Sequence, residues 1–145
     1  MPVPSQVSAA ELARVASASY INNTFRVALI DAPGSDFDAT DSLATILSGE
    51  VTDGLGGYTR QQIGYTQADL DVYNSGKRAL ARKAAEFAHN GNTAETIRFS
   101  HVVLLNPTET GVVSVTKLSA RATLSDSQTA IFYFDLTLYG VFVVE

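Results

Sequence analysis

The segment that most constrains the fold is residues 129–139, with the sequence TAIFYFDLTLY. Its even positions over 132–138 hold Phe, Phe, Leu and Leu, whereas its odd positions over 133–139 hold Tyr, Asp, Thr and Tyr. A period of two residues, built from aromatic and β-branched types, predicts a strand with one face in a core and the other partly in water. Gly140 interrupts this pattern, and Val141–Val144 follows as a second apolar run. The chain therefore belongs to the β-sheet class.

The composition narrows the classes of partner. At 145 residues the chain has the length of about one domain with a single core. Hydrophobic residues make up 46% and charged residues 17%, so the chain is not disordered, and either uncharged polar residues or a partner must cover much of its surface. The formal net charge of −5 argues against nucleic acid as a partner. Without cysteine there is neither a disulfide nor a thiolate metal site.

Nothing in the sequence predicts a targeting segment or a membrane span. Residues 1–6 lack the basic and apolar regions of a signal peptide. No apolar run approaches the roughly 18–20 residues that cross a bilayer. We therefore expect a soluble protein that is made in a cytoplasm and contacts no membrane.

Helix signals are confined to the first third of the chain. Residues 1–7 contain two prolines and are expected to form an extended, mobile arm. Ser8, followed three residues later by Glu11, fits a capping box and predicts a short helix over residues 9–17. A second short helix is expected through residues 43–47. Its candidate caps are Asp38 and Thr40, and its expected end is Gly49.

Strand signals dominate the rest of the chain. Residues 80–88 have the composition of a helix, but Asn90-Gly91-Asn92 resembles a tight turn, so we interpret 80–88 as a strand and half of a hairpin. Many short strands separated by turns predict a mainly β fold, a single-domain jelly roll or β-sandwich over residues 8–145 with one or two short N-terminal helices. The other expected strands are 25–30, 58–65, 95–99, 102–105 (buried on both faces), 112–118, 121–124 and 129–139.

No catalytic or metal-binding constellation emerges from the spacing. The acidic cluster of Asp31, Asp36, Asp38 and Asp41 fails the EF-hand pattern and is interpreted as a loop with helix-capping carboxylates. His89 and His101 could lie across a hairpin, but a zinc site needs further ligands. No serine lies in a nucleophile elbow, and residues 54–57 lack the spacing of a phosphate loop. We expect no enzyme activity, no metal and no cofactor.

Six amphipathic side chains are candidates for a binding face. Grouped tyrosines with few charges around them favour a protein interface, and a sugar-binding face is the alternative. For any single tyrosine, packing on a sheet is the commoner role. The interface candidates are Tyr58, Arg60, Tyr65, Tyr73, Tyr133 and Tyr139.

From Gly57 onward the order of motifs resembles a group of small bacteriophage virion proteins. Residues 57–61, GYTRQ, match the pattern Gly-Tyr-x-Arg-Gln of that group. Residues 100–105, SHVVLL, are similar to its strand, which usually reads Thr-His-x-x-apolar, with Ser100 in the place of Thr. The chain departs from the group in having no tryptophan, where Trp-Gly often precedes the Thr-His strand. Further matches are Asn92-Thr93, Ile97-Arg98-Phe99, Thr116-Lys117-Leu118, Leu124-Ser125-Asp126 and the closing strand before Gly140.

The resemblance implies a non-enzymatic structural protein of the virion, made in the host cytoplasm. It implies a jelly-roll or β-sandwich subunit that decorates and cements the capsid through contacts with other virion proteins, the major capsid protein first. A symmetric homo-oligomer, a trimer, is expected. The alternatives are a tail, fibre-adaptor or baseplate component and, third, a carbohydrate-binding β-sandwich in host recognition.

Overall fold

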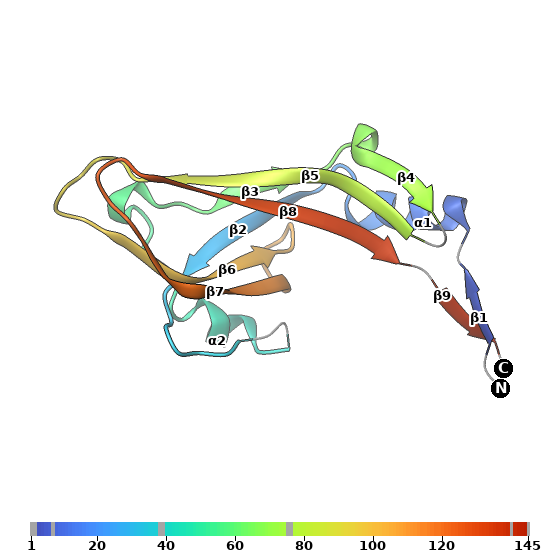
Figure 1. Ribbon diagram of the computed structural model, residues 1–145, viewed down its shortest axis with the longest axis horizontal. Coiled ribbons are helices and arrows are strands. Elements are labelled where there is room, and N and C mark those ends of the chain that lie inside the picture. Colours follow the sequence, from blue (N-terminus) through green and yellow to red (C-terminus); the bar gives the residue numbers. More distant parts are fainter. Residues whose placement is uncertain (1–2, 7, 38–39, 75–76, 140, 145) are drawn as a thin grey trace. The chain divides into compact units, whose positions relative to one another are not determined.

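The computed structural model describes residues 3–6, 8–37, 40–74, 77–139 and 141–144 (Figure 1). Strands predominate in this part of the chain, so the fold is mainly β, as the sequence predicts. The helices are α1 (Ala9–Ser19) and α2 (Leu43–Leu47), with 3-10 turns η1 (Leu55–Gly57) and η2 (Gln67–Asp69). The strands are β1 (Val3–Gln6), β2 (Thr24–Ile30), β3 (Gln61–Gly64), β4 (Leu70–Asn74), β5 (Lys77–Ala88), β6 (Ile97–Leu105), β7 (Val112–Leu124), β8 (Thr129–Tyr139) and β9 (Val141–Val144).

The chain divides into two compact units, and each is described by itself. The first unit consists of residues 1–24, 64–84 and 133–145, and the second of residues 25–63 and 85–132. Strands β5 and β8 each continue from one unit into the other.

The second unit is a β-sandwich. One layer is the sheet with strand order β3-β2-β6-β7, in which β6 is antiparallel to both β2 and β7. The other layer is formed by the parts of β5 and β8 that belong to this unit (Figure 1). Aromatic rings join the layers: the ring of Phe99 on β6 lies 5.7 Å, centroid to centroid, from that of Phe132 on β8. Within the second layer, Phe132 lies 6.2 Å from Phe87 of β5. The core of this unit is therefore aromatic.

The opposite face of the β2–β6 pair is also covered. Ala28, Ile30, Val103 and Leu105 pack with Ile46 of α2 in one fully buried cluster. Residues 102–105 are therefore buried on both faces, as their continuous apolar sequence predicts.

Three predictions about local structure need correction. The side chain of Ser42, not of Asp38 or Thr40, caps α2 by accepting a hydrogen bond from the Thr45 N–H at 3.2 Å; Asp38 lies outside the described residues. The strand expected over 58–65 is confined to β3. Residues 80–88 do form a strand, but β5 and β6 belong to different sheets, so the turn after β5 leads across the sandwich and closes no hairpin.

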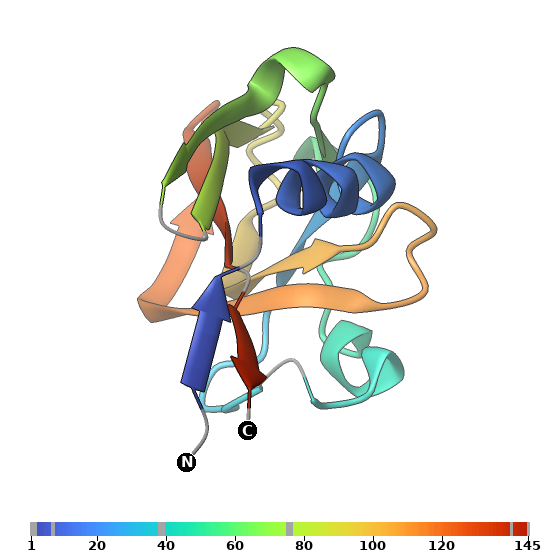
Figure 2. The same cartoon turned by 90° about the vertical axis from the view of Figure 1, so that its right-hand side faces the viewer.

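The first unit contains α1, two short strands at its chain ends and part of a second sheet. In the sheet of order β4-β5-β8, β4 is antiparallel to β5, with Leu70 opposite Leu80. Within the stretch expected to be an arm, residues 3–6 form β1, which pairs antiparallel with β9, Val3 opposite Val144 (Figure 2). No helix in the described ranges has the length and hydropathy of a membrane-spanning segment.

The aromatic core of the second unit can be tested with two neighbouring residues of β8. Truncation by Phe132→Ala removes ring contacts with Phe87 and Phe99 and should lower the free energy of unfolding by about 3 kcal/mol. The control is Ile131→Ala, because Ile131 is 46% exposed and should contribute within about 0.5 kcal/mol. Urea denaturation of both variants measures the difference; equal effects would contradict the assigned faces of β8.

Candidate functional site

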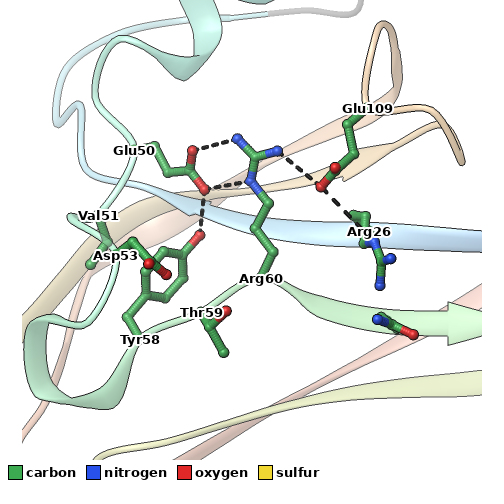
Figure 3. Close-up of a pocket in the computed structure, with 9 residues that line it drawn as sticks. Arg26, Glu50, Val51, Asp53, Tyr58, Thr59, Arg60 and Glu109 are labelled. Atoms are coloured by element: carbon green, nitrogen blue, oxygen red, sulfur yellow. Dashed lines mark hydrogen bonds and ion pairs between the residues drawn. The ribbon is translucent and has the colours of Figure 1, made fainter.

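A polar pocket of about 480 Å³ lies in the second unit (Figure 3). Glu50 lines the pocket and is held by an isolated antiparallel β-bridge to Ile30 of β2. Arg60 lies just before β3, and Glu109 lies in the turn between β6 and β7. The charged side chains lining the pocket are Arg26, Glu50, Asp53, Arg60 and Glu109.

Arg60 and Glu50 form the central ion pair of this pocket. The Nε of Arg60 donates to Oε2 of Glu50 at 2.8 Å, and its Nη2 donates to Oε1 at 2.6 Å. The remaining Nη1 donates to Glu109 Oε1 at 3.0 Å, and this oxygen lies 3.9 Å from Arg26 Nε (Figure 3). A planar guanidinium held by two carboxylates has a fixed orientation.

Tyr58 links this ion pair to the core. Its hydroxyl donates to Glu50 Oε2 at 2.7 Å and accepts from the Leu29 N–H at 3.1 Å. Its ring is 3% exposed and stacks on Phe87 with a centroid distance of 6.0 Å. The hydroxyl therefore satisfies a buried donor of β2 and a carboxylate at once.

These contacts set the charge states of the three groups. Burial and the Glu50 carboxylate raise the pKa of Tyr58. Burial alone would raise the pKa of Glu50, but hydrogen bonds from Arg60 and Tyr58 outweigh it and lower that pKa. Hydrogen bonds to Glu50 and Glu109 raise the pKa of Arg60. None of the three is placed to exchange a proton near neutral pH, as general acid–base chemistry requires.

The two histidines are buried and take part in the fold of the second unit. His89 Nδ1 accepts from the Gly91 N–H at 2.9 Å, so its Nε2 is the donor to the Glu95 carbonyl at 2.8 Å. His101 Nε2 lies 3.0 Å from the Ser35 carbonyl, and its Nδ1 lies 2.7 Å from Ser100 Oγ. No group of three or more His, Asp or Glu residues suited to a metal ion occurs in the described part of the chain.

The first unit carries a second polar cluster, on its surface. Arg82 of β5 donates from Nε and Nη2 to the two carboxylate oxygens of Asp135 on β8, at 2.9 and 2.8 Å. Its guanidinium carbon lies 5.3 Å from the ring centroid of Tyr133. The side chains of Arg82 and Asp135 are 61% and 63% exposed, and Tyr133 is 60% exposed. These three residues are called the β8 cluster below.

The expected tyrosine face needs correction at two positions. Tyr58 and Tyr65 are both 3% exposed, so neither can form an exposed binding face of this chain. Arg60 is engaged by Glu50 and Glu109. Tyr133 is exposed, whereas Tyr73 and Tyr139 lie in β4 and β8 with side chains outside the described set.

The sequence reasoning missed the carboxylates that hold the two arginines. Glu109 is 49 residues from Arg60, and Asp135 is 53 residues from Arg82. The only available signal was the alternation of β8, which places Asp135 on the same face as Tyr133.

Comparison with known proteins gives no match to a protein-family model, to a curated protein or to a solved structure.

The carboxylate of Glu50 makes stability depend on pH. Because its folded-state pKa is lowered, it stabilises the fold above the ordinary glutamate pKa of about 4.3, and this contribution is lost as pH falls through the folded-state value. Replacement by Glu50→Gln should cost about 2 kcal/mol at pH 7, and the difference from wild type should shrink below pH 4.3.

Urea denaturation between pH 3 and pH 7 measures this effect. The matched control is Glu86→Gln, which removes an exposed carboxylate on β5 and should change the free energy of unfolding by less than about 0.5 kcal/mol. A constant difference between Glu50→Gln and wild type across this range would refute the assigned role.

The hydroxyl of Tyr58 provides a separate test. Tyr58→Phe leaves the buried Leu29 N–H without its acceptor and should lower the free energy of unfolding by about 2 kcal/mol. Tyr133→Phe removes an exposed hydroxyl and should cost less than about 0.5 kcal/mol. Thermal or urea unfolding of the two variants would show equal losses if the Tyr58 hydroxyl had no structural role.

Proposed function

We propose that this chain is a non-enzymatic structural protein of a bacteriophage virion, most specifically a capsid decoration protein that stabilises the head through protein–protein contacts. The observation that carries the proposal is the order of motifs from Gly57 to Gly140, which resembles small virion proteins. The mainly β fold is of the type that this resemblance implies.

The geometry of the polar pocket favours a structural role over catalysis. Arg60 and Glu50 bind one another and are oriented further by Glu109 and Tyr58. Groups that satisfy each other in this way rigidify a wall and leave no free base or nucleophile among them. The exposed tyrosine and arginine of the β8 cluster are the residue types enriched where proteins bind one another.

The proposed partners are other virion proteins, the major capsid protein first, with the chain acting as a homo-oligomer. A decoration protein that binds across neighbouring capsid subunits stabilises only the assembled shell, and therefore resists its opening by mass action. A tail, fibre-adaptor or baseplate position is the structural alternative.

Location in the particle tests the proposal. Immunogold labelling of intact virions with an antibody against this chain should mark the head, at a copy number comparable with that of the major capsid protein. A handful of copies at one end of the particle would favour the tail alternative. Absence of the chain from purified virions would overturn the proposal.

Heat tolerance tests the cementing role. Virions assembled without this chain should release their genome at a lower temperature than complete virions, because the bound subunits no longer oppose opening. Adding back the purified chain should restore the original release temperature. Equal release temperatures with and without the chain would contradict cementing.

A further inference from the structure

Strand β8 is an edge strand of its sheet. In the order β4-β5-β8, one side of its backbone has no strand partner within the described residues. Free N–H and C=O groups along an edge are a template for pairing with another chain. Over residues 129–136 the exposure of its side chains alternates strictly, which is the mark of a regular strand.

The other long edge strand, β7, carries features that hinder such pairing. Its register with β6 shifts twice, between Phe99 and His101 and again between Leu104 and Leu105. Bulges of this kind are one means by which proteins protect exposed edges. The two long edges of this chain therefore differ in their readiness to accept a strand.

Among the exposed side chains described on β8, Asp135 alone is charged, and its charge is neutralised. Asp135 alone would discourage a second strand, but Arg82 holds both of its carboxylate oxygens and leaves a locally neutral surface beside Tyr133. An ion pair this exposed adds little stability, and ordering its long side chains costs entropy. Folding alone therefore does not account for the cluster, whereas side chains already ordered for binding reduce the cost of association.

We propose that the free edge of β8 docks the β8 strand of a second copy of this chain, antiparallel across a two-fold axis. An interface between two identical surfaces must be self-complementary. The β8 cluster meets this condition because it presents one cation, one anion and one aromatic ring side by side. A two-fold axis that crosses β8 near Asp135 would place the two β8 clusters beside one another, and the pairing removes both free edges at once.

This inference goes beyond the proposed function, which expects a homo-oligomer but does not depend on one and assigns no contact. A two-fold β8 contact makes that oligomer a dimer in place of the trimer that the resemblance implies. Light scattering coupled to size exclusion, or sedimentation equilibrium, should give twice the 15.4 kDa mass of one chain. Tyr133→Lys should raise the dimer dissociation constant by about 30-fold or more, the scale of a hot-spot residue. The matched control Thr116→Lys places the same charge at an exposed position of β7 and should leave the dimer intact.

A charge exchange tests the local neutrality of the β8 cluster, provided that the free energy of unfolding of each variant is measured beside its mass. Arg82→Asp should weaken the dimer because like charges then meet across the axis, and combining it with Asp135→Arg should restore it. A monomer, a three-chain mass, or a dimer that survives Tyr133→Lys would overturn the inference. Virion labelling separates the two proposals. A monomeric chain found on heads would contradict only the β8 contact. A β8 dimer that is absent from virions would contradict only the proposed function.

Discussion

The structure depends on the burial of β6 on both faces. Eight of the nine residues of Ile97–Leu105 are buried, the exception being Arg98. A strand in this position needs a cover on each side, which in the second unit the aromatic layer of β5 and β8 and the helix α2 supply. The two buried polar residues of β6 must then find internal partners: Ser100 Oγ accepts from the Ala32 N–H at 2.8 Å, and His101 Nε2 lies within hydrogen-bond distance of the Ser35 carbonyl. Hydrogen bonds to the buried strand β6 therefore hold the loop after β2 in place.

The same constraint explains how the charges are arranged. In the loop held by β6, Asp31 forms an ion pair with Arg121 of β7, and Asp36 forms one with Lys117 of the same strand. The hydrogen bonds of the buried polar residues of β6 therefore also position two ion pairs at the sheet edge. The Tyr58 hydroxyl accepts a hydrogen bond from the Leu29 N–H of β2 and donates one to Glu50. Glu50 in turn accepts from Arg60. Most ionic groups described in the second unit therefore orient one another. A chain with few charges that uses them internally leaves apolar, aromatic and backbone groups as its means of contact with other molecules.

Local sequence patterns predicted the elements better than their partners. The alternation of residues 129–139 and the apolar run of 102–105 specify strands because side-chain period and burial are local properties. Residues 80–88 form a strand against their helical propensity because the sheet environment overrides a preference worth only tenths of a kcal/mol per residue. Whether the following turn closes a hairpin or crosses a sandwich depends on which strands later pair, which no local pattern records. Tyr58 and Tyr65 were misplaced for the same reason, since an amphipathic ring suits a surface and a core equally well.

The proposed β8 dimer has to form despite the net charge of the chain. A net charge of −5 opposes association of free copies, but in physiological salt this repulsion is screened beyond about 8 Å. At shorter range only the local surface matters, and the Arg82–Asp135 pair makes the edge of β8 neutral there. The net charge of the chain therefore acts between copies that are far apart, whereas the neutral edge of β8 matters only when two copies are in contact. Removing Arg82 would extend the repulsion to contact distance, whereas a neutral substitution elsewhere on the surface would not. In the proposed dimer the position of the pair, rather than the number of charges, therefore controls association.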